Sequence, residues 1–183
     1  MKIALVLHSG GMDSTVCLLK AKNESRKVIS LGIDYGQRHK IELEYAQVQC
    51  KRYGVERRLL RVAWDKPDRH IPTGRSLDEI RSGISPAFLP MRNAVFLTLA
   101  CAEAVGIQAE EVWIGVNDLD YSGYPDCRPE FIGGNGDRRK MVDKRVPSQY
   151  AVLYPEAVLK KAGDSQWPGC PDSLFLISRR RIM

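Results

Sequence analysis

The chain has 183 residues, and 44% of them are hydrophobic, which is enough for one domain with a substantial core. The formal net charge is +6, and residues 133–183 supply most of it, with ten Lys/Arg against five Asp/Glu. No apolar run approaches ~18 residues, and the chain opens on a strand pattern rather than a secretion signal, so we expect a cytoplasmic protein without membrane-spanning helices.

Short apolar runs, typical of strands buried on both faces, alternate along the chain with segments of helical spacing. The expected strands are residues 2–8, 27–35, 55–62 and 111–117. The expected helices are residues 13–22, 40–54 and 91–106. The third strand is more polar than the others, which favours a place near the edge of the sheet. Residues 63–88 hold three prolines and two glycines among charges, a pattern that predicts a long loop or lid.

This alternation predicts the α/β class, with a doubly wound parallel sheet and crossover helices. In such sheets, ligands bind beyond the carboxyl ends of the strands. Three polar segments that contain glycine follow the first, second and fourth strands: "SGGMDST", "DYGQRH" and "NDLDYSGYPDCRPE". We therefore expect all three segments to meet at one edge of the sheet and to form a binding site there.

The segment "SGGMDST" has the residue types of an anion-binding turn between a strand and a helix. Residues 9–11 can turn their backbone N–H groups toward one anion, Asp13 can cap the helix, and Ser14 and Thr15 add hydroxyl groups at its positive end. The lysine of the common phosphate loop is absent. The loop therefore suits a pyrophosphate unit, with a metal ion bridging Asp13 and the phosphates.

These residues resemble a known family. "SGGMDST" resembles the pyrophosphate loop of the N-type ATP pyrophosphatases, an adenine nucleotide alpha hydrolase-like group with a Rossmann-like fold. The segments "DYGQRH" (34–39), "PMRNAVFLTLA" (90–100) and "GVNDLDYSGYPDCRPEFI" (115–132) resemble the narrower family of 7-cyano-7-deazaguanine synthases. That family makes preQ0, the nitrile precursor of queuosine-type tRNA bases, and the resemblance covers residues 2–132.

The resemblance implies an ATP-dependent carbon–nitrogen ligase that converts 7-carboxy-7-deazaguanine and ammonia to the nitrile. A carboxylate must be adenylated before ammonia attacks it, and a second adenylation turns the amide oxygen into a leaving group. ATP and Mg²⁺ are the implied cofactors. The implied ATP-binding residues are His8, Ser9, Gly10, Gly11, Met12, Asp13, Ser14, Thr15, Val16, Cys17 and Leu18.

Catalytic roles are expected, by the same resemblance, for residues that can stabilise developing phosphate charge: Asp13, Arg38, His39 and Arg92. Arg38 and His39 have an equally weighted alternative as polar surface at a helix start, and His39 is also a candidate general base toward ammonia. The expected substrate-binding residues combine carboxylates for amino donors with aromatic rings for stacking: Asn93, Asp120, Tyr121, Tyr124, Asp126 and Arg128. Asp118 is an alternative turn residue, and Cys127 is expected to be structural.

The resemblance ends after Ile132, where the family continues toward a zinc site of four cysteines. Only Cys170 remains in that region of this chain, so we predict no zinc site. The division expected is a catalytic domain at residues 1–132 and a divergent basic tail at 133–183. Two explanations of the tail are open. One is genuine divergence, and the other, which we favour, is a change of reading frame near residue 133 that would leave the tail partly disordered.

Alternative functions remain open at this point. One alternative is a different ATP pyrophosphatase that modifies tRNA or forms amides. Another is an inactive nucleotide-binding remnant. An RNA-binding role of the basic tail is a further alternative, although solvated surface is the favoured interpretation of such charges. The expected partners are therefore a small deazapurine and ammonia, with neither a membrane nor direct nucleic-acid contact. A homodimer is implied only by the resemblance.

Overall fold

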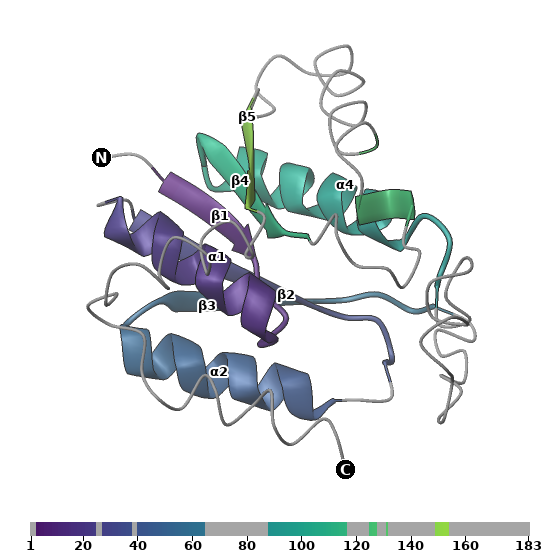
Figure 1. Ribbon diagram of the computed structural model, residues 1–183, viewed down its shortest axis with the longest axis horizontal. Coiled ribbons are helices and arrows are strands. Elements are labelled where there is room, and N and C mark those ends of the chain that lie inside the picture. Colours follow the sequence, from purple (N-terminus) through teal and green to yellow (C-terminus); the bar gives the residue numbers. More distant parts are fainter. Residues whose placement is uncertain are drawn as a thin grey trace, which may run out of the picture.

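The computed structural model describes residues 3–24, 27–37, 40–64, 88–116, 125–127, 131 and 149–153. Its strands are β1 (Ile3–Leu7), β2 (Lys27–Asp34), β3 (Glu56–Arg61), β4 (Glu111–Gly115) and β5 (Gln149–Leu153). Its helices are α1 (Met12–Asn23), α2 (Ile41–Tyr53), α4 (Arg92–Gly106) and the short 3-10 helix η1 (Pro125–Cys127) (Figure 1). Every predicted strand and helix through residue 117 is present, within two residues at each end.

The five strands form one parallel sheet in the order β3-β2-β1-β4-β5. The chain therefore builds outward from β1 through β2 to β3, and then returns to the other side of β1 with β4. This reversal confirms the predicted doubly wound α/β fold, and it places a topological switch point between β1 and β4. The polar strand β3 lies at one edge of the sheet, as its sequence predicted.

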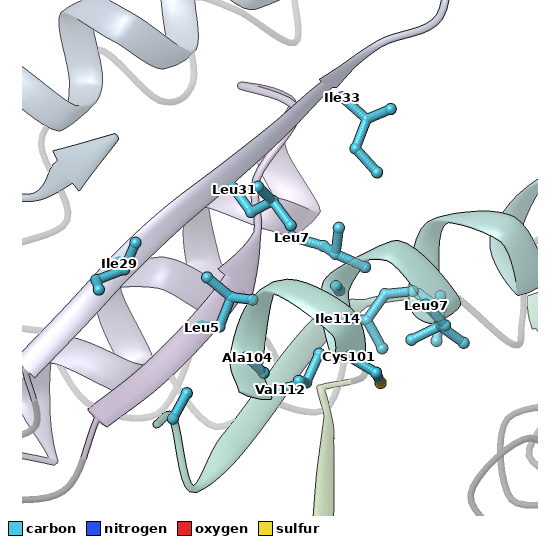
Figure 2. Packing of buried hydrophobic residues seen from close by; sticks show 13 residues of the cluster. Leu5, Leu7, Ile29, Leu31, Ile33, Leu97, Cys101, Ala104, Val112 and Ile114 are labelled. Atoms are coloured by element: carbon cyan, nitrogen blue, oxygen red, sulfur yellow. The ribbon is translucent and has the colours of Figure 1, made fainter. Parts of the chain in front are cut away.

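The inner strands bury both of their faces, because successive side chains of a strand point to opposite sides. On one face, Leu5 of β1 is level with Ile29 of β2 and Val112 of β4. These residues pack with Leu97 and other buried residues of α4, as Figure 2 shows. On the opposite face, the neighbours of these residues along the strands pack against α1; this second cluster contains Ala4, Val6, Cys17, Leu18, Ala21, Val28 and Trp113.

Helix α2 contacts β2 and β3 through a narrow buried stripe that includes Ala46 and Cys50. It ends at Gly54, which takes the left-handed conformation with φ 64°. Glycine adopts this conformation without the steric cost that a side chain brings, so Gly54 suits this C-cap position. Helix α1 follows β1, and α2 connects β2 to β3, which leaves α4 on the opposite face of the sheet (Figure 1).

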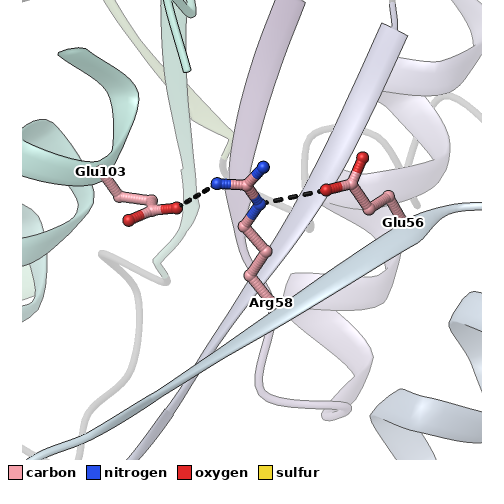
Figure 3. A network of polar contacts seen from close by, with 3 residues as sticks. All are labelled: Glu56, Arg58 and Glu103. Carbon is pink, nitrogen blue, oxygen red and sulfur yellow. Dashed lines mark hydrogen bonds and ion pairs between the residues drawn. The ribbon is translucent and has the colours of Figure 1, made fainter. Parts of the chain in front are cut away.

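An ion-pair network joins the edge strand to the helix on that face. Arg58 Nη1 of β3 donates to Glu103 Oε1 of α4 at 2.6 Å, and Arg58 Nε donates to Glu56 Oε1 at 3.0 Å (Figure 3). The Arg58 side chain remains 40% exposed. Solvent therefore screens the network, which orients β3 against α4 more than it stabilises the fold.

Strand β5 was not predicted, because the sequence after residue 132 shows little periodicity. The structure pairs it in parallel with β4, with Gln149 opposite Glu111 and Leu153 opposite Gly115. Most of the predicted loop at 63–88 lies outside the described residues, as does most of the tail at 133–183. No helix within the described part of the chain combines the length and the apolar character needed to cross a bilayer.

Candidate functional site

The candidate site lies at the carboxyl end of β1, beside the switch point of the sheet. The chain leaves β1 at His8, turns through residues 9–11 and enters α1 at Met12. Gly115, the last residue of β4, lies against this turn: a Cβ there would be 2.8 Å from the carbonyl oxygen of Asp13 and 3.1 Å from the nitrogen of Ser14. The glycine in β4 thus lets the first turn of α1 approach the sheet closely.

The N-cap of α1 is Gly11, which has no side chain with which to cap the helix. Asp13 is therefore not the N-cap residue that the sequence analysis expected. Asp13 lies one residue inside the helix, where its negative charge favours the positive end of the helix dipole. Because the first four N–H groups of a helix lack partners within the helix, a helix start is a common place for an anion to bind.

Hydroxyl groups brace the turn from inside. Ser14 Oγ accepts the backbone N–H of Ser9 at 3.2 Å and donates to the carbonyl of Gly11 at 3.0 Å. Thr15 Oγ1 donates to the same carbonyl at 2.8 Å, and the N–H of Gly11 donates to Ser9 Oγ at 3.2 Å. Ser14 and Thr15 are buried, while Ser9 is exposed. The two buried hydroxyl groups therefore hold the backbone of the turn through hydrogen bonds.

The two glycines of the turn have different surroundings. Gly10 adopts φ 91°, and a Cβ there would overlap the carbonyl oxygen of Glu42 and lie 2.8 Å from the nitrogen of Ala46 in α2. Gly11 adopts φ −73°, and a Cβ there would meet only Ser9 Oγ, at 3.4 Å. The backbone therefore requires glycine at position 10. At position 11 it does not, and the missing side chain leaves room beside the helix start.

A buried polar network lies directly behind the turn. His8 is 1% exposed; its Nε2 donates to Gln49 Oε1 at 3.0 Å, and its Nδ1 lies 3.1 Å from Ser30 Oγ. Burial, and to a smaller extent the charge of Arg57, lowers the pKa of His8 from 6.5 to about 4. His8 is therefore neutral at physiological pH and carries its proton on Nε2, since an amide oxygen only accepts.

Three members of this network were missed by the sequence analysis: Ser30, Gln49 and Arg57. Arg57 Nη1 of β3 donates to the carbonyl of His8 at 3.2 Å and to Ser30 Oγ at 3.0 Å. Its guanidinium occupies the space in front of Gly32, where a Cβ would overlap Nη2. The sequence offered a signal for Ser30 alone, because Ser30 is a polar residue inside the apolar run of β2.

The start of α4 forms a second part of this edge. The backbone N–H of Asn93 donates to Asp126 Oδ2 at 3.1 Å, and Asn93 Nδ2 donates to the carbonyl of Asp126 at 3.2 Å. Asp126 is 2% exposed, and burial raises the pKa of its carboxyl, against the lowering effects of the Asn93 N–H and the Arg92 charge. The predicted residues Arg92, Asn93 and Asp126 are thus brought together, with Asp126 capping α4 from a distant segment.

The same edge of the sheet holds the end of β2. The ring of Tyr35 packs 5.2 Å from Phe96 in the first turns of α4, and 6.3 Å from Trp64, which follows β3 (centroid distances). Since α4 runs back along the sheet toward the start of β4, its first residues lie at the carboxyl ends of the strands. The sequence prediction that these segments converge is therefore supported for the described residues.

Several predicted site residues have a packing role in α1. Val16, Cys17 and Leu18 are buried, and burial raises the pKa of the Cys17 thiol to about 12. Met12 is 40% exposed at the helix start. The remaining predicted residues lie outside the described residues: Arg38, His39, Asp118, Asp120, Tyr121, Tyr124 and Arg128. Their roles remain predictions.

Metal-ligating side chains are sparse in the described ranges. No group of three or more His, Cys, Asp or Glu residues gathers there. The four cysteines described, Cys17, Cys50, Cys101 and Cys127, form no disulfide bond within these ranges. Cys170 lies outside these ranges, so the predicted absence of a zinc site remains a prediction. A single carboxylate such as Asp13 suits Mg²⁺, which binds one or two carboxylates together with phosphate oxygens.

Known proteins resemble the chain in sequence and in fold. A solved structure described as a predicted subunit of tRNA methyltransferase from Methanocaldococcus jannaschii superposes with a TM-score of 0.50 at 18% identity, covering 84% of this chain and 68% of that one. This likeness concerns the fold alone. A 7-cyano-7-deazaguanine synthase 2 from Rhodopseudomonas palustris is 55% identical over 130 residues, which are 71% of this chain and 62% of the relative.

Other relatives extend the match further along the chain. A 7-cyano-7-deazaguanine synthase from Novosphingobium aromaticivorans is 41% identical over 173 residues, which are 90% of this chain and 72% of the relative. One from Myxococcus xanthus is 43% identical over 140 residues, 72% of this chain and 61% of the relative. The chain thus spans about three fifths of the length of the Rhodopseudomonas and Myxococcus proteins. The family model described as queuosine biosynthesis protein QueC matches residues 3–146, and the chain belongs to that family.

Proposed function

We propose that the protein is an ATP-dependent ligase that converts 7-carboxy-7-deazaguanine and ammonia to 7-cyano-7-deazaguanine. The observation that carries this proposal is the start of α1 at the switch point, where the N-cap is Gly11 and the missing side chain leaves room beside the helix. Membership of the QueC family and the similarity to 7-cyano-7-deazaguanine synthases indicate the substrate.

The chemistry divides into two adenylations. The substrate carboxylate attacks the α-phosphorus of ATP and releases pyrophosphate, and ammonia then displaces AMP from the acyl adenylate to give an amide. The amide oxygen attacks a second ATP in the same way. Loss of AMP and of the nitrogen-bound protons then forms the carbon–nitrogen triple bond. In each round the protein mainly orients the reactants and stabilises charge on the departing pyrophosphate.

The described residues suit the pyrophosphate half of this task. The N–H groups of Met12, Asp13 and Ser14 lie in the first turn of α1, after the N-cap Gly11, and the helix dipole favours negative charge there. Asp13 would hold a magnesium ion that neutralises phosphate charge when it is bound. The Arg92 charge, at the start of α4, would act from the other side of the same edge. Water exclusion and recognition of the deazapurine would fall to the segments after β2 and β4.

The test is a complete reaction with the purified chain, 7-carboxy-7-deazaguanine, ATP, Mg²⁺ and ammonium, followed by chromatography of the nitrile and of AMP. The proposal expects two AMP for each nitrile formed. AMP that appears with other acceptors but without the nitrile would indicate a different ATP pyrophosphatase. Bound ATP without any AMP would indicate a nucleotide-binding remnant, and would contradict the ligase.

A further inference from the structure

The phosphate-binding turn is held from behind by two side chains of neighbouring elements. Gln49 of α2 donates from Nε2 to the carbonyl of Gly10 at 3.4 Å, and Arg57 of β3 donates from Nη1 to the carbonyl of His8 at 3.2 Å. These two residues reach the turn from 39 and 49 positions further along the chain. We propose that Gln49 and Arg57 are positioning residues that orient the peptide planes of this turn for the phosphates of ATP.

The orientation follows from the geometry of a trans peptide, whose C=O and N–H groups point in opposite directions. When Arg57 binds the carbonyl of His8, the N–H of Ser9 must face the other side of the turn, where it donates to Ser14 Oγ at 3.2 Å. When Gln49 binds the carbonyl of Gly10, the N–H of Gly11 faces Ser9 Oγ at 3.2 Å. Both N–H groups therefore point into the loop, away from α2 and β3.

The Gln49 side chain is itself fixed at its other end. Its Oε1 accepts from His8 Nε2 at 3.0 Å and lies 3.2 Å from Thr15 Oγ1. His8 in turn lies beside Ser30, to which Arg57 Nη1 also donates, at 3.0 Å. The five side chains form one network that joins β2, β3, α1 and α2 to His8, the residue that follows β1. The position of the turn is therefore set by side chains of the neighbouring strands and helices, and not by its own backbone alone.

The proposal rests on the proposed function only in naming ATP as the ligand. Gln49→Met keeps the length of the side chain and removes both of its hydrogen-bonding groups. Its matched control is Gln47→Met, at an exposed position of the same helix. Arg57→Met removes the second contact, Arg57→Lys keeps one donor as a conservative rescue, and Arg52→Met, in the last turn of α2, is the control.

The first measurement is calorimetric titration of each variant with MgATP, well below its melting temperature. We expect Gln49→Met and Arg57→Met to raise the Kd about tenfold, the equivalent of ~1.4 kcal/mol and the size expected for one hydrogen bond to the turn. Arg57→Lys should recover part of this loss, and both controls should bind like the wild type. A Kd within twofold of the wild type in Gln49→Met and Arg57→Met, whatever their melting temperatures, would overturn the proposal.

The second measurement requires no ligand, so it separates this proposal from the proposed function. Amide hydrogen exchange in a peptide spanning residues 8–14 should become faster in Gln49→Met and Arg57→Met, while β1 and β4 keep their protection. Unchanged exchange in the turn would contradict a positioning role. A wild type whose turn is protected but which binds no MgATP would instead contradict the proposed function, and with it ATP as the ligand of this turn.

Discussion

His8 Nδ1 lies 3.1 Å from Ser30 Oγ, so the last residue before the turn at residues 9–11 is joined to the middle of the neighbouring strand. Arg57 Nη1 donates to the same hydroxyl, which leaves the Ser30 proton for His8. This direction of donation requires a neutral imidazole. A positive His8 would lose its acceptor at Nδ1 and would face the Arg57 charge across Ser30.

Acid should therefore weaken the fold through His8. Its pKa is about 4 in the folded protein and ordinarily 6.5, so the unfolded chain binds the extra proton first as the pH falls. The contribution of neutral His8 to the unfolding free energy is complete above pH 6.5 and is lost progressively toward pH 4. The full loss is on the order of 3 kcal/mol.

The measurement is urea unfolding of the wild type and of His8→Gln at pH 7 and at pH 4.5. We expect the wild type to lose more unfolding free energy between the two pH values than the variant, since glutamine does not titrate. An equal loss in both proteins would show that His8 does not carry this dependence.

The two glycines of the turn should respond oppositely to alanine. Gly10→Ala forces a side chain into φ 91° and against the backbone of α2, so we expect a loss of about 2–4 kcal/mol of unfolding free energy. Gly11→Ala has an ordinary φ and adds only a van der Waals contact with Ser9 Oγ, so its stability should stay within ~0.5 kcal/mol of the wild type. Its Kd for MgATP should nevertheless rise at least about tenfold, because the new methyl group takes the room beside the helix start. Chemical denaturation and nucleotide titration of the two variants decide this; normal ATP binding by Gly11→Ala would contradict it.

Gly115→Ala tests the contact between β4 and α1. A Cβ at this position lies 2.8 Å from a backbone oxygen of Asp13, and backbone cannot move aside as a flexible side chain can. We expect a loss of about 1–3 kcal/mol in urea denaturation. Gly106→Ala, at the end of α4 with nothing within 4 Å, is the matched control and should be neutral or slightly stabilising. Equal stability of the two variants would exclude a tight contact at Gly115.

Asp126 should prove important for the fold through Asn93. Asp126→Ala removes the acceptor of the Asn93 backbone N–H in a buried position, and we expect a cost of about 1–3 kcal/mol. Glu110→Ala, at an exposed acidic position, is the control and should stay within ~0.5 kcal/mol of the wild type. Thermal denaturation compares the two variants, and a silent Asp126→Ala would show that α4 does not need this cap.

The sequence by itself determined the order and type of the strands and helices through β4, because apolar periodicity reports directly which faces a segment must bury. It also placed the glycine turn after β1, and the polar character of β3 indicated its position at an edge. It missed β5, whose place is set by hydrogen bonds to β4 rather than by a pattern of its own. Pairing with an existing edge requires little periodicity in the strand that is added.

Only the tertiary structure decided how the turn is supported. Gln49 and Arg57 have no local signal, because each is one polar residue in a mixed segment, and their partners lie 27 to 49 positions away along the chain. The structure likewise shows that the N-cap of α1 is Gly11 and not Asp13. It also shows that Asp126 forms a buried hydrogen bond with Asn93. Local patterns specify which segments pack. Which buried hydrogen-bonding groups then meet depends on the register and packing of elements that the chain brings together from a distance.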